Sequence, residues 1–141
     1  MKTIKSKKGF TMVEIVIVLV IIAILIGAAV PAMIGFVGEA RGKAYAAEAK
    51  NCATAVQAIS SEHFVVNNSS PTQAMFLEAT GVYNARLGDM LAPDNQATDI
   101  TAITIDSNGK LTGLIFLKNG YYVKVVPGKA AEVSRTALTL T

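Results

Sequence analysis

The chain has 141 residues, enough for one modest folded domain but rarely for two independent hydrophobic cores. Four of its basic residues are lysines within the first eight positions; with them the formal charge is +3, and without them it is −1. We therefore expect no direct nucleic-acid binding by the chain alone, because that function needs basic side chains gathered on a folded surface.

Residues 1–9 form a short basic leader that precedes an uncharged segment. From Ile15 to Gly38 no Asp, Glu, Lys, Arg or His occurs over 24 residues. A helix of that length spans about 36 Å at ~1.5 Å per residue, enough to cross a bilayer core of ~30 Å. The run is longer than an ordinary secretory signal, so we predict that residues 10–38 are a retained transmembrane or assembly helix.

Helix-weakening residues fall in the second half of this segment. Pro31 removes one backbone hydrogen bond and Gly27 has low helix propensity, so the helix is expected to be weak or kinked there. Such breaks are tolerated in lipid when neighbouring helices cover the freed carbonyl groups. The pattern favours a helix that lies among other helices, while a kinked monomeric anchor stays an open alternative.

Residues 39–64 continue the helix with an amphipathic character. Apolar and small residues recur at steps of three and four, opposite a polar face. This stripe consists of Tyr45, Ala49, Cys52, Val56, Ile59 and His63. It should pack on a downstream sheet, with Cys52 as a small buried residue and His63 in a structural role.

The remaining chain predicts a connecting region and then a sheet. Residues 65–99 read as a loop with a short helix from Pro71 to about Ala79, which Ser70 and Gln73 would begin as a capping box. Residues 100–141 carry strand signals separated by two Asn-Gly pairs, which are typical of hairpins. The predicted fold class is α+β: one long N-terminal helix, with a transmembrane half and an amphipathic half, packed on an antiparallel sheet of three to four strands.

The stretch that carries functional information is Lys7-Lys8-Gly9-Phe10-Thr11-Met12-Val13-Glu14. Glu14 stands one residue before the uncharged run, and a carboxylate at membrane depth costs several kcal/mol unless it is paired or functional. A simple anchor whose glutamate reaches the membrane interface remains an alternative for this residue considered alone.

Residues 1 to about 35 closely resemble the signal of type IV prepilins and pseudopilins, in which a basic leader ending in Gly is followed by Phe-Thr, two hydrophobic residues, Glu and the membrane helix. The resemblance implies cleavage after Gly9 by a membrane-embedded prepilin peptidase, then N-methylation of Phe10. It implies that Glu14 is the acidic assembly residue, whose carboxylate pairs with the Phe10 ammonium of a neighbouring subunit, and that Pro31 is the helix-breaking proline.

The chain also departs from the family's pattern. Related subunits often have Gly where this chain has Ala23, whereas this chain has Gly27, so the resemblance does not assign the site of any helix melting. Many Gram-negative pilins close a C-terminal loop with two cysteines, which a chain with one cysteine lacks, and this favours a Gram-positive or divergent source. Some pseudopilins bind calcium, but the aspartates of residues 89–106 are spaced too widely for a calcium loop.

The resemblance implies a structural subunit of a type IV pilus filament that serves adhesion, twitching motility or DNA uptake. Its implied partners are copies of itself in a helical filament, the prepilin peptidase, an assembly ATPase and an inner-membrane platform protein. The precursor would be a single-pass protein of the cell membrane and the assembled form an extracellular pilus. Two alternatives stay open: a pseudopilin of type II secretion or competence, and a membrane-anchored binding protein. We predict no enzymatic activity, cofactor or metal, because the sequence has no phosphate-binding loop and no clustered His or Cys.

Overall fold

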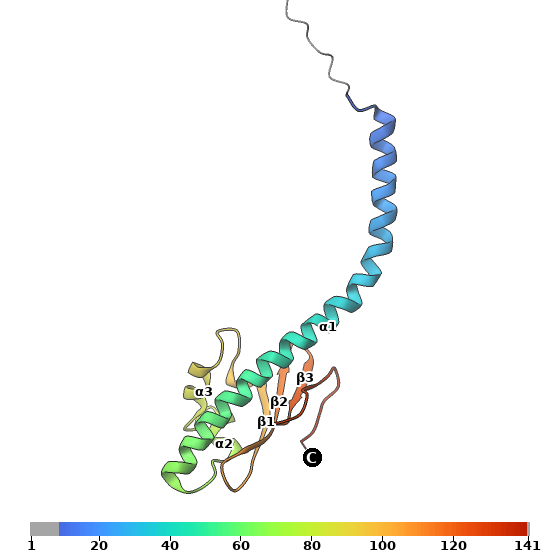
Figure 1. The fold of residues 1–141 in the computed structure, drawn as a ribbon. Helices are drawn as coiled ribbons and strands as arrows, with labels where there is room; N and C mark the ends of the chain where they lie inside the picture. Colours follow the sequence, from blue (N-terminus) through green and yellow to red (C-terminus); the bar gives the residue numbers. More distant parts are fainter. Residues whose placement is uncertain (1–8, 141) are drawn as a thin grey trace, which may run out of the picture. The chain divides into compact units, whose positions relative to one another are not determined.

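The computed structural model describes residues 9–140 and shows two compact units, divided between Glu39 and Ala40. The described part of the first, residues 9–39, is called the N-terminal unit; that of the second, residues 40–140, is called the head domain. The lysines of the predicted leader lie outside the described residues. Helix α1 (Met12–Asn67) contributes its first half to the N-terminal unit and its second half to the head domain (Figure 1).

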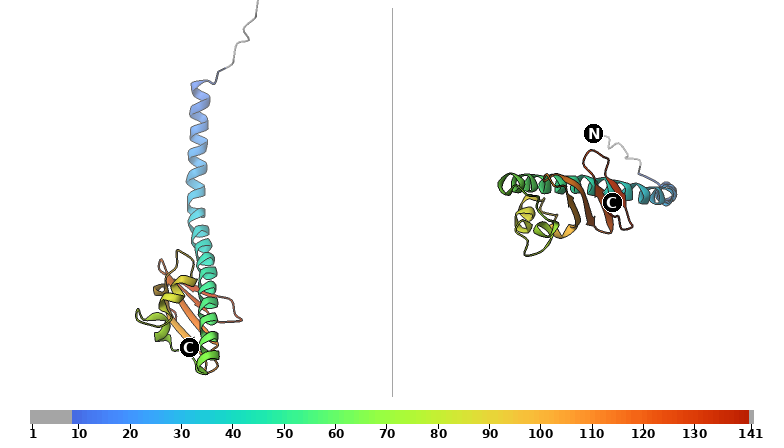
Figure 2. Two further views of the ribbon diagram at one scale, coloured as in Figure 1. Left: turned by 90° about the vertical axis from the view of Figure 1, so that its left-hand side faces the viewer. Right: turned by 90° about the horizontal axis from the view of Figure 1, so that it is seen from below.

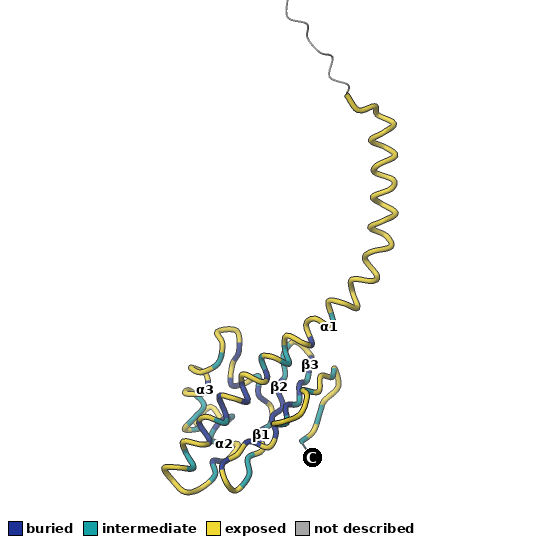
Figure 3. The backbone as a smooth tube through the Cα atoms, in the orientation of Figure 1, coloured by how far each residue is buried: buried dark blue, intermediate teal, exposed yellow. Residues whose placement is uncertain are grey.

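The first half of α1 is a helix in which no described residue is buried. It carries the apolar run that makes α1 long and apolar enough to cross a membrane, and none of that run is buried. Its large side chains are exposed all round, with Ile24 at 67% and Phe36 at 73% of full exposure. Figure 3 shows this half without a buried residue. An apolar helix surface of this extent is stable only against lipid or against other helices.

The second half of α1 covers one face of the sheet, as its amphipathic stripe predicts. Ala49, Cys52, Val56 and Ile59 are buried, while Tyr45 and His63 at the ends of the stripe are partly buried. These side chains share one core with the inward-facing residues of the strands and with Phe76 and Leu87 of the connecting region. The helix ends at Asn67 because Asn68 adopts a left-handed backbone with φ 50°.

The sheet has four antiparallel strands in the order β1-β2-β3-β4. The strands are β1 (Ile100–Ile105), β2 (Leu111–Lys118), β3 (Tyr121–Val125) and β4 (Glu132–Ser134). Strand β2 is central and mostly buried, and Phe116 lies opposite Ile100 on one side and Val123 on the other. The α+β class and the strand count are therefore confirmed.

Both predicted hairpins are present. Lys118 pairs with Tyr121 across a two-residue loop, in which Asn119 and Gly120 have φ values of 50° and 77°. Positive φ at both central residues defines the type I′ turn that an Asn-Gly pair favours. The first hairpin joins β1 to β2 through Gly109, whose φ is 75°.

The connecting region contains more helix than predicted, and the capping box predicted from Ser70 and Gln73 is absent. It forms α2 (Gln73–Leu77), α3 (Asn84–Met90) and the 3-10 helix η1 (Ala97–Asp99), and α2 packs on β1. Helix α2 begins two residues later than expected, after Thr72. Ser70 and Gln73 do not cap it, because Ser70 Oγ donates to Asp106 O and Gln73 Oε1 accepts a hydrogen bond from Ile103 N. Bonds to the sheet thus replace the local capping pair.

Polar side chains fasten the β1–β2 hairpin to α1. Ser60, fully buried, donates to the carbonyl of Gly109 at 2.7 Å. Gln57 Nε2 donates to the same carbonyl at 3.1 Å, and Gln57 Oε1 accepts from Leu111 N at 2.6 Å. The position of the turn is therefore specified by hydrogen bonds as well as by apolar packing.

Replacing Gln57 by leucine should destabilise the head domain by about 1–3 kcal/mol, because the Leu111 amide loses its acceptor in a partly buried site. Urea unfolding of the full chain in detergent measures this loss. Thr54→Ala is the matched control on the same helix, since Thr54 is exposed and its hydroxyl bonds only to the Lys50 carbonyl. Equal stability of the Gln57 variant and the control would show that the turn does not depend on this bond.

The buried thiol of Cys52 is expected to be unreactive. Burial, and then the nearby charges of Asp99 and Glu48, raise its pKa to about 11. At neutral pH the thiolate fraction is about three-hundredfold lower than for an exposed cysteine near pKa 8.5. A thiol reagent should therefore label the native chain at least about 100 times more slowly than the chain in denaturant. Similar rates in the two states would mean that the thiol is accessible.

Candidate functional site

The first turn of α1 is built around a reciprocal capping box. Thr11 precedes the first helical residue, and its Oγ1 accepts a hydrogen bond from Glu14 N at 3.2 Å. In return, Glu14 Oε2 accepts from Thr11 N at 2.8 Å and from Thr11 Oγ1 at 2.9 Å. The box satisfies amide groups that a helix N-terminus otherwise leaves unpaired, and it fixes the carboxylate at the positive end of the helix dipole.

Only one oxygen of the Glu14 carboxylate takes part in this box. Both bonds from Thr11 reach Oε2, and Oε1 accepts no hydrogen bond from any described residue. A carboxylate oxygen of this kind can take an additional charged donor without breaking the cap. The site can therefore hold its own helix start and bind an ammonium group at the same time.

The structure brings three of the predicted site residues together. Gly9 and Phe10 lie in the exposed, non-helical segment directly before the capping box, and the Phe10 side chain is 84% exposed. Gly9 is thus accessible to a peptidase in the described chain. Cleavage after it would create a new ammonium group on Phe10, four residues before Glu14.

Gly27 and Pro31 lie further along the same helix. The helical backbone continues through both residues, which are exposed. A break or melting at this point stays a prediction about the assembled state.

Thr11 is the functional residue that our reading of the sequence did not single out. A Thr followed three residues later by Glu, directly before an apolar run, is a capping-box signature that the sequence does contain. The position of the Glu14 charge beside an apolar run predicted a contact between subunits. The structure shows that Glu14 also has a partner within its own chain.

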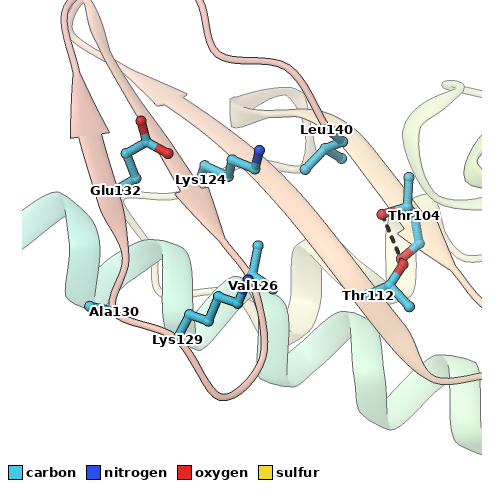
Figure 4. Close-up of a pocket in the computed structure, with 8 residues that line it drawn as sticks. All are labelled: Thr104, Thr112, Lys124, Val126, Lys129, Ala130, Glu132 and Leu140. Carbon is cyan, nitrogen blue, oxygen red and sulfur yellow. Dashed lines mark hydrogen bonds between the residues drawn. The ribbon is translucent and has the colours of Figure 1, made fainter.

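A second feature is a hollow of about 450 Å³ on the outer face of the sheet (Figure 4). Its lining comes from all four strands, the β3–β4 turn and the C-terminal tail, and consists of Thr104, Thr112, Lys124, Val126, Lys129, Ala130, Glu132 and Leu140. Thr112 donates to Thr104, and Lys124 donates to the Thr139 carbonyl. The lining pairs no nucleophile with a base, so it does not form the arrangement that covalent catalysis requires.

His63 has the structural role that was predicted for it. Its Nδ1 lies 2.6 Å from the hydroxyl of Tyr83, and the two rings meet edge to face. This contact ties the end of α1 to the connecting region. Among the described residues, no group of three or more His, Cys, Asp or Glu is placed to hold a metal ion.

Comparison with known proteins finds a match in the N-terminal part of the chain. Residues 4–30 match the family model described as the prokaryotic N-terminal methylation motif. The chain therefore carries the type IV pilin and pseudopilin signal, and this supports a pilin-like or pseudopilin precursor. Proteins of the type IV pilin family are structural and not enzymatic.

No curated protein and no solved structure matched the chain in the same comparisons. The matched motif covers the leader and the first part of the apolar helix, and the head domain lies outside it. The motif is prokaryotic in general, so the predicted Gram-positive source is unsupported.

Proposed function

We propose that this chain is the structural subunit of a type IV pilus filament. It is made as a single-pass membrane precursor, cut after Gly9 by a prepilin peptidase, methylated on the amine of Phe10, and polymerised through the first half of α1. The observation that carries the proposal is the combination, on one helix, of the methylation signal with an apolar surface that is not buried by any described residue.

The exposed half of α1 supplies the cohesion between subunits. Relative to exposure to water, each fully buried Val, Leu, Ile, Phe or Met side chain contributes about 1.5–3 kcal/mol. Large apolar side chains cover this half on every side. Transfer from the membrane into a bundle of identical helices keeps these side chains away from water, so a copy of the chain is a suitable partner.

The first turn supplies the register between subunits. In the precursor, the leader occupies the position before Phe10; after cleavage, that position holds a charged amine. An ammonium in an apolar fibre is costly unless it is paired, and Glu14 Oε1 is an acceptor without a donor among the described residues. At ~4 Å the two charges attract by about 4 kcal/mol at an effective dielectric near 20. We therefore assign the Phe10 amine of one subunit to Glu14 of its neighbour.

The mass and N-terminal sequence of the mature protein test the processing step. The proposal expects a chain that begins at Phe10 and carries one methyl group on its amine. A control variant, Gly9→Leu, should keep the leader, because a large side chain replaces the glycine at the bond to be cut. A mature chain that begins at Met1, or that is cut after Ala29 or Ala32, would contradict the proposal.

The length of the fibre distinguishes a pilus from a pseudopilus. A pilus subunit should be abundant in long fibres sheared from the cell surface, whereas a pseudopilin should stay in short fibres within the envelope. An assembly ATPase and an inner-membrane platform protein are the proposed assembly partners in both cases. Electron microscopy of the sheared fraction, with immunogold labelling of the chain, makes this distinction.

A further inference from the structure

Charge is unevenly distributed over the head domain. Residues 78–99, which include α3 and η1, contain four acidic residues and one basic residue, Arg86. The two terminal guanidinium nitrogens of Arg86 donate to the carboxylate of Glu62. Residues 121–140, which include β3 and β4, contain three basic residues and one acidic residue. The domain thus has an acidic side and a basic side.

These two sides belong to opposite edges of the sheet. Helix α2 packs on β1 and contacts α3, which places the acidic segment beside the β1 edge. Strand β4 forms the other edge. Figures 1 and 2 show α2 and α3 beyond β1, away from β3 and the C-terminal tail.

The basic side contains an open, mainly apolar groove of about 620 Å³. It lies between α1 and the turn that follows β3, and its lining includes Thr54, Ala58, Leu111 and Val126. Two exposed lysines, Lys50 and Lys129, also line it. Among the described residues, neither lysine has an ion-pair partner.

The acidic side has the complementary character. Asp89 and Asp94 are exposed, and the exposed side chains near them in the sequence include Val82 at 76% and Met90 at 47%. The end of the segment is held in place, because Lys118 Nζ on β2 donates to the Asp94 carbonyl and to Asn95 Oδ1 as well as to Glu48 Oε2. The segment combines apolar side chains with negative charge, and its fixed end lowers the entropy cost of binding.

We propose that the acidic segment 82–94 of one copy docks into the groove marked by Lys50 and Lys129 on a second copy. This inference rests on the proposed function and extends it from the N-terminal helix to the head domains. Charge complementarity selects the partner, and the apolar side chains of the segment cover the apolar lining of the groove.

The geometry of this contact fits a fibre. The two docking surfaces are different and share no residue, so one copy can bind one neighbour through its groove and another neighbour through its acidic segment. A contact of this heterologous type produces open helical assemblies when the rotation does not close into a ring. A symmetric dimer would instead need one surface that is complementary to itself.

Disulfide cross-linking in assembled filaments tests the contact. In the double variant Asp89→Cys with Lys129→Cys, oxidation should give a ladder of dimers, trimers and higher oligomers on a non-reducing gel. Each single variant should give at most a trace of dimer, since it carries only half of the pair. Asp89→Cys with Lys110→Cys is the control, because Lys110 is exposed on the β1–β2 turn and does not line the groove. The native Cys52 is buried and does not interfere.

Charge reversal provides an independent measurement. Asp89→Lys or Lys129→Glu alone should lower filament yield at least about fivefold at low salt, because each places like charges face to face. The combination of both should restore the yield to within about twofold of the wild type. Normal filament yield from the single charge-reversal variants would overturn this inference, and so would equal cross-linking of the control pair and the 89–129 pair. Either result would leave filament formation itself intact. A wild-type chain that forms no filaments would instead contradict the proposed function.

Discussion

Replacing Glu14 with glutamine should abolish filament formation while leaving cleavage after Gly9 near its normal level. Glutamine has the same shape and keeps a side-chain oxygen that can accept the capping bonds from Thr11. It lacks the negative charge that the ammonium of a neighbouring Phe10 requires. Loss of about 4 kcal/mol per contact corresponds to roughly a thousandfold weaker pairing at each step of assembly. Yield of sheared filaments, with processing followed on a gel, measures both effects.

Thr11→Val is the matched control for this prediction. It removes the hydroxyl from the capping box but keeps the Glu14 charge, at a cost of about 0.5–2 kcal/mol for a lost helix cap. We expect this variant to assemble, with a moderately reduced yield. If the Thr11 variant loses filaments and the Glu14 variant keeps them, the glutamate serves the helix start and not the contact between subunits.

Phe116→Ala should have the largest effect on the head domain. Phe116 is fully buried at the centre of the sheet, and its strand neighbours Ile100 and Val123 are buried as well. Truncation of such a side chain costs about 3–5 kcal/mol, a large part of the ~5–15 kcal/mol that stabilises a small domain. The melting temperature should fall by roughly 15–30 °C. Because a destabilised head is degraded more readily, the amount of precursor should fall as well.

Phe36→Ala provides the matched control, since it makes the same chemical change on the exposed half of α1. Phe36 is 73% exposed in the isolated chain, so its truncation should leave the melting temperature of the head domain within about 2 °C of the wild type. The chain contains four tyrosines and no tryptophan, so tyrosine fluorescence in detergent follows unfolding. Equal melting temperatures for the two variants would contradict the placement of Phe116 in the core.

Local patterns predicted most of the fold. The spacing of Ala49, Cys52, Val56 and Ile59 identified the buried face of α1, because helical periodicity depends on neighbours within a few residues. The Asn119-Gly120 pair identified its turn, because positive φ values are a property of those residues themselves. In both examples, the residues that determine the local structure lie within one helical segment or one loop.

Contacts between distant segments were not predictable in this way. Ser70 has the sequence pattern of a helix cap, yet its hydroxyl bonds to the hairpin at Asp106 and Gly109, more than 30 residues away. The local and distant hydrogen-bond partners are similar in strength, and tertiary packing decides between them. The groove beside Lys50 and Lys129 likewise joins segments about 80 residues apart, and no local pattern brings them together.

The candidate site combines a contact that is predictable from the local sequence with one that is not. The cap between Thr11 and Glu14 is local and is visible in the sequence as a Thr-x-x-Glu pattern. The donor for Glu14 Oε1 belongs, in our proposal, to another copy of the chain. Its geometry depends on how copies pack, which is set by the whole apolar surface of α1 and not by any short motif.

The central claim is that copies of the chain polymerise through the first half of α1. An electron cryomicroscopy reconstruction of filaments that have been sheared from cells tests it most directly. We predict a fibre whose centre is a bundle of residues 12–38 from many copies, with the methylated amine of Phe10 in one subunit within hydrogen-bonding distance of Glu14 in the next. A processed chain that stays monomeric, or a fibre in which these helices lie apart from one another, would contradict the claim.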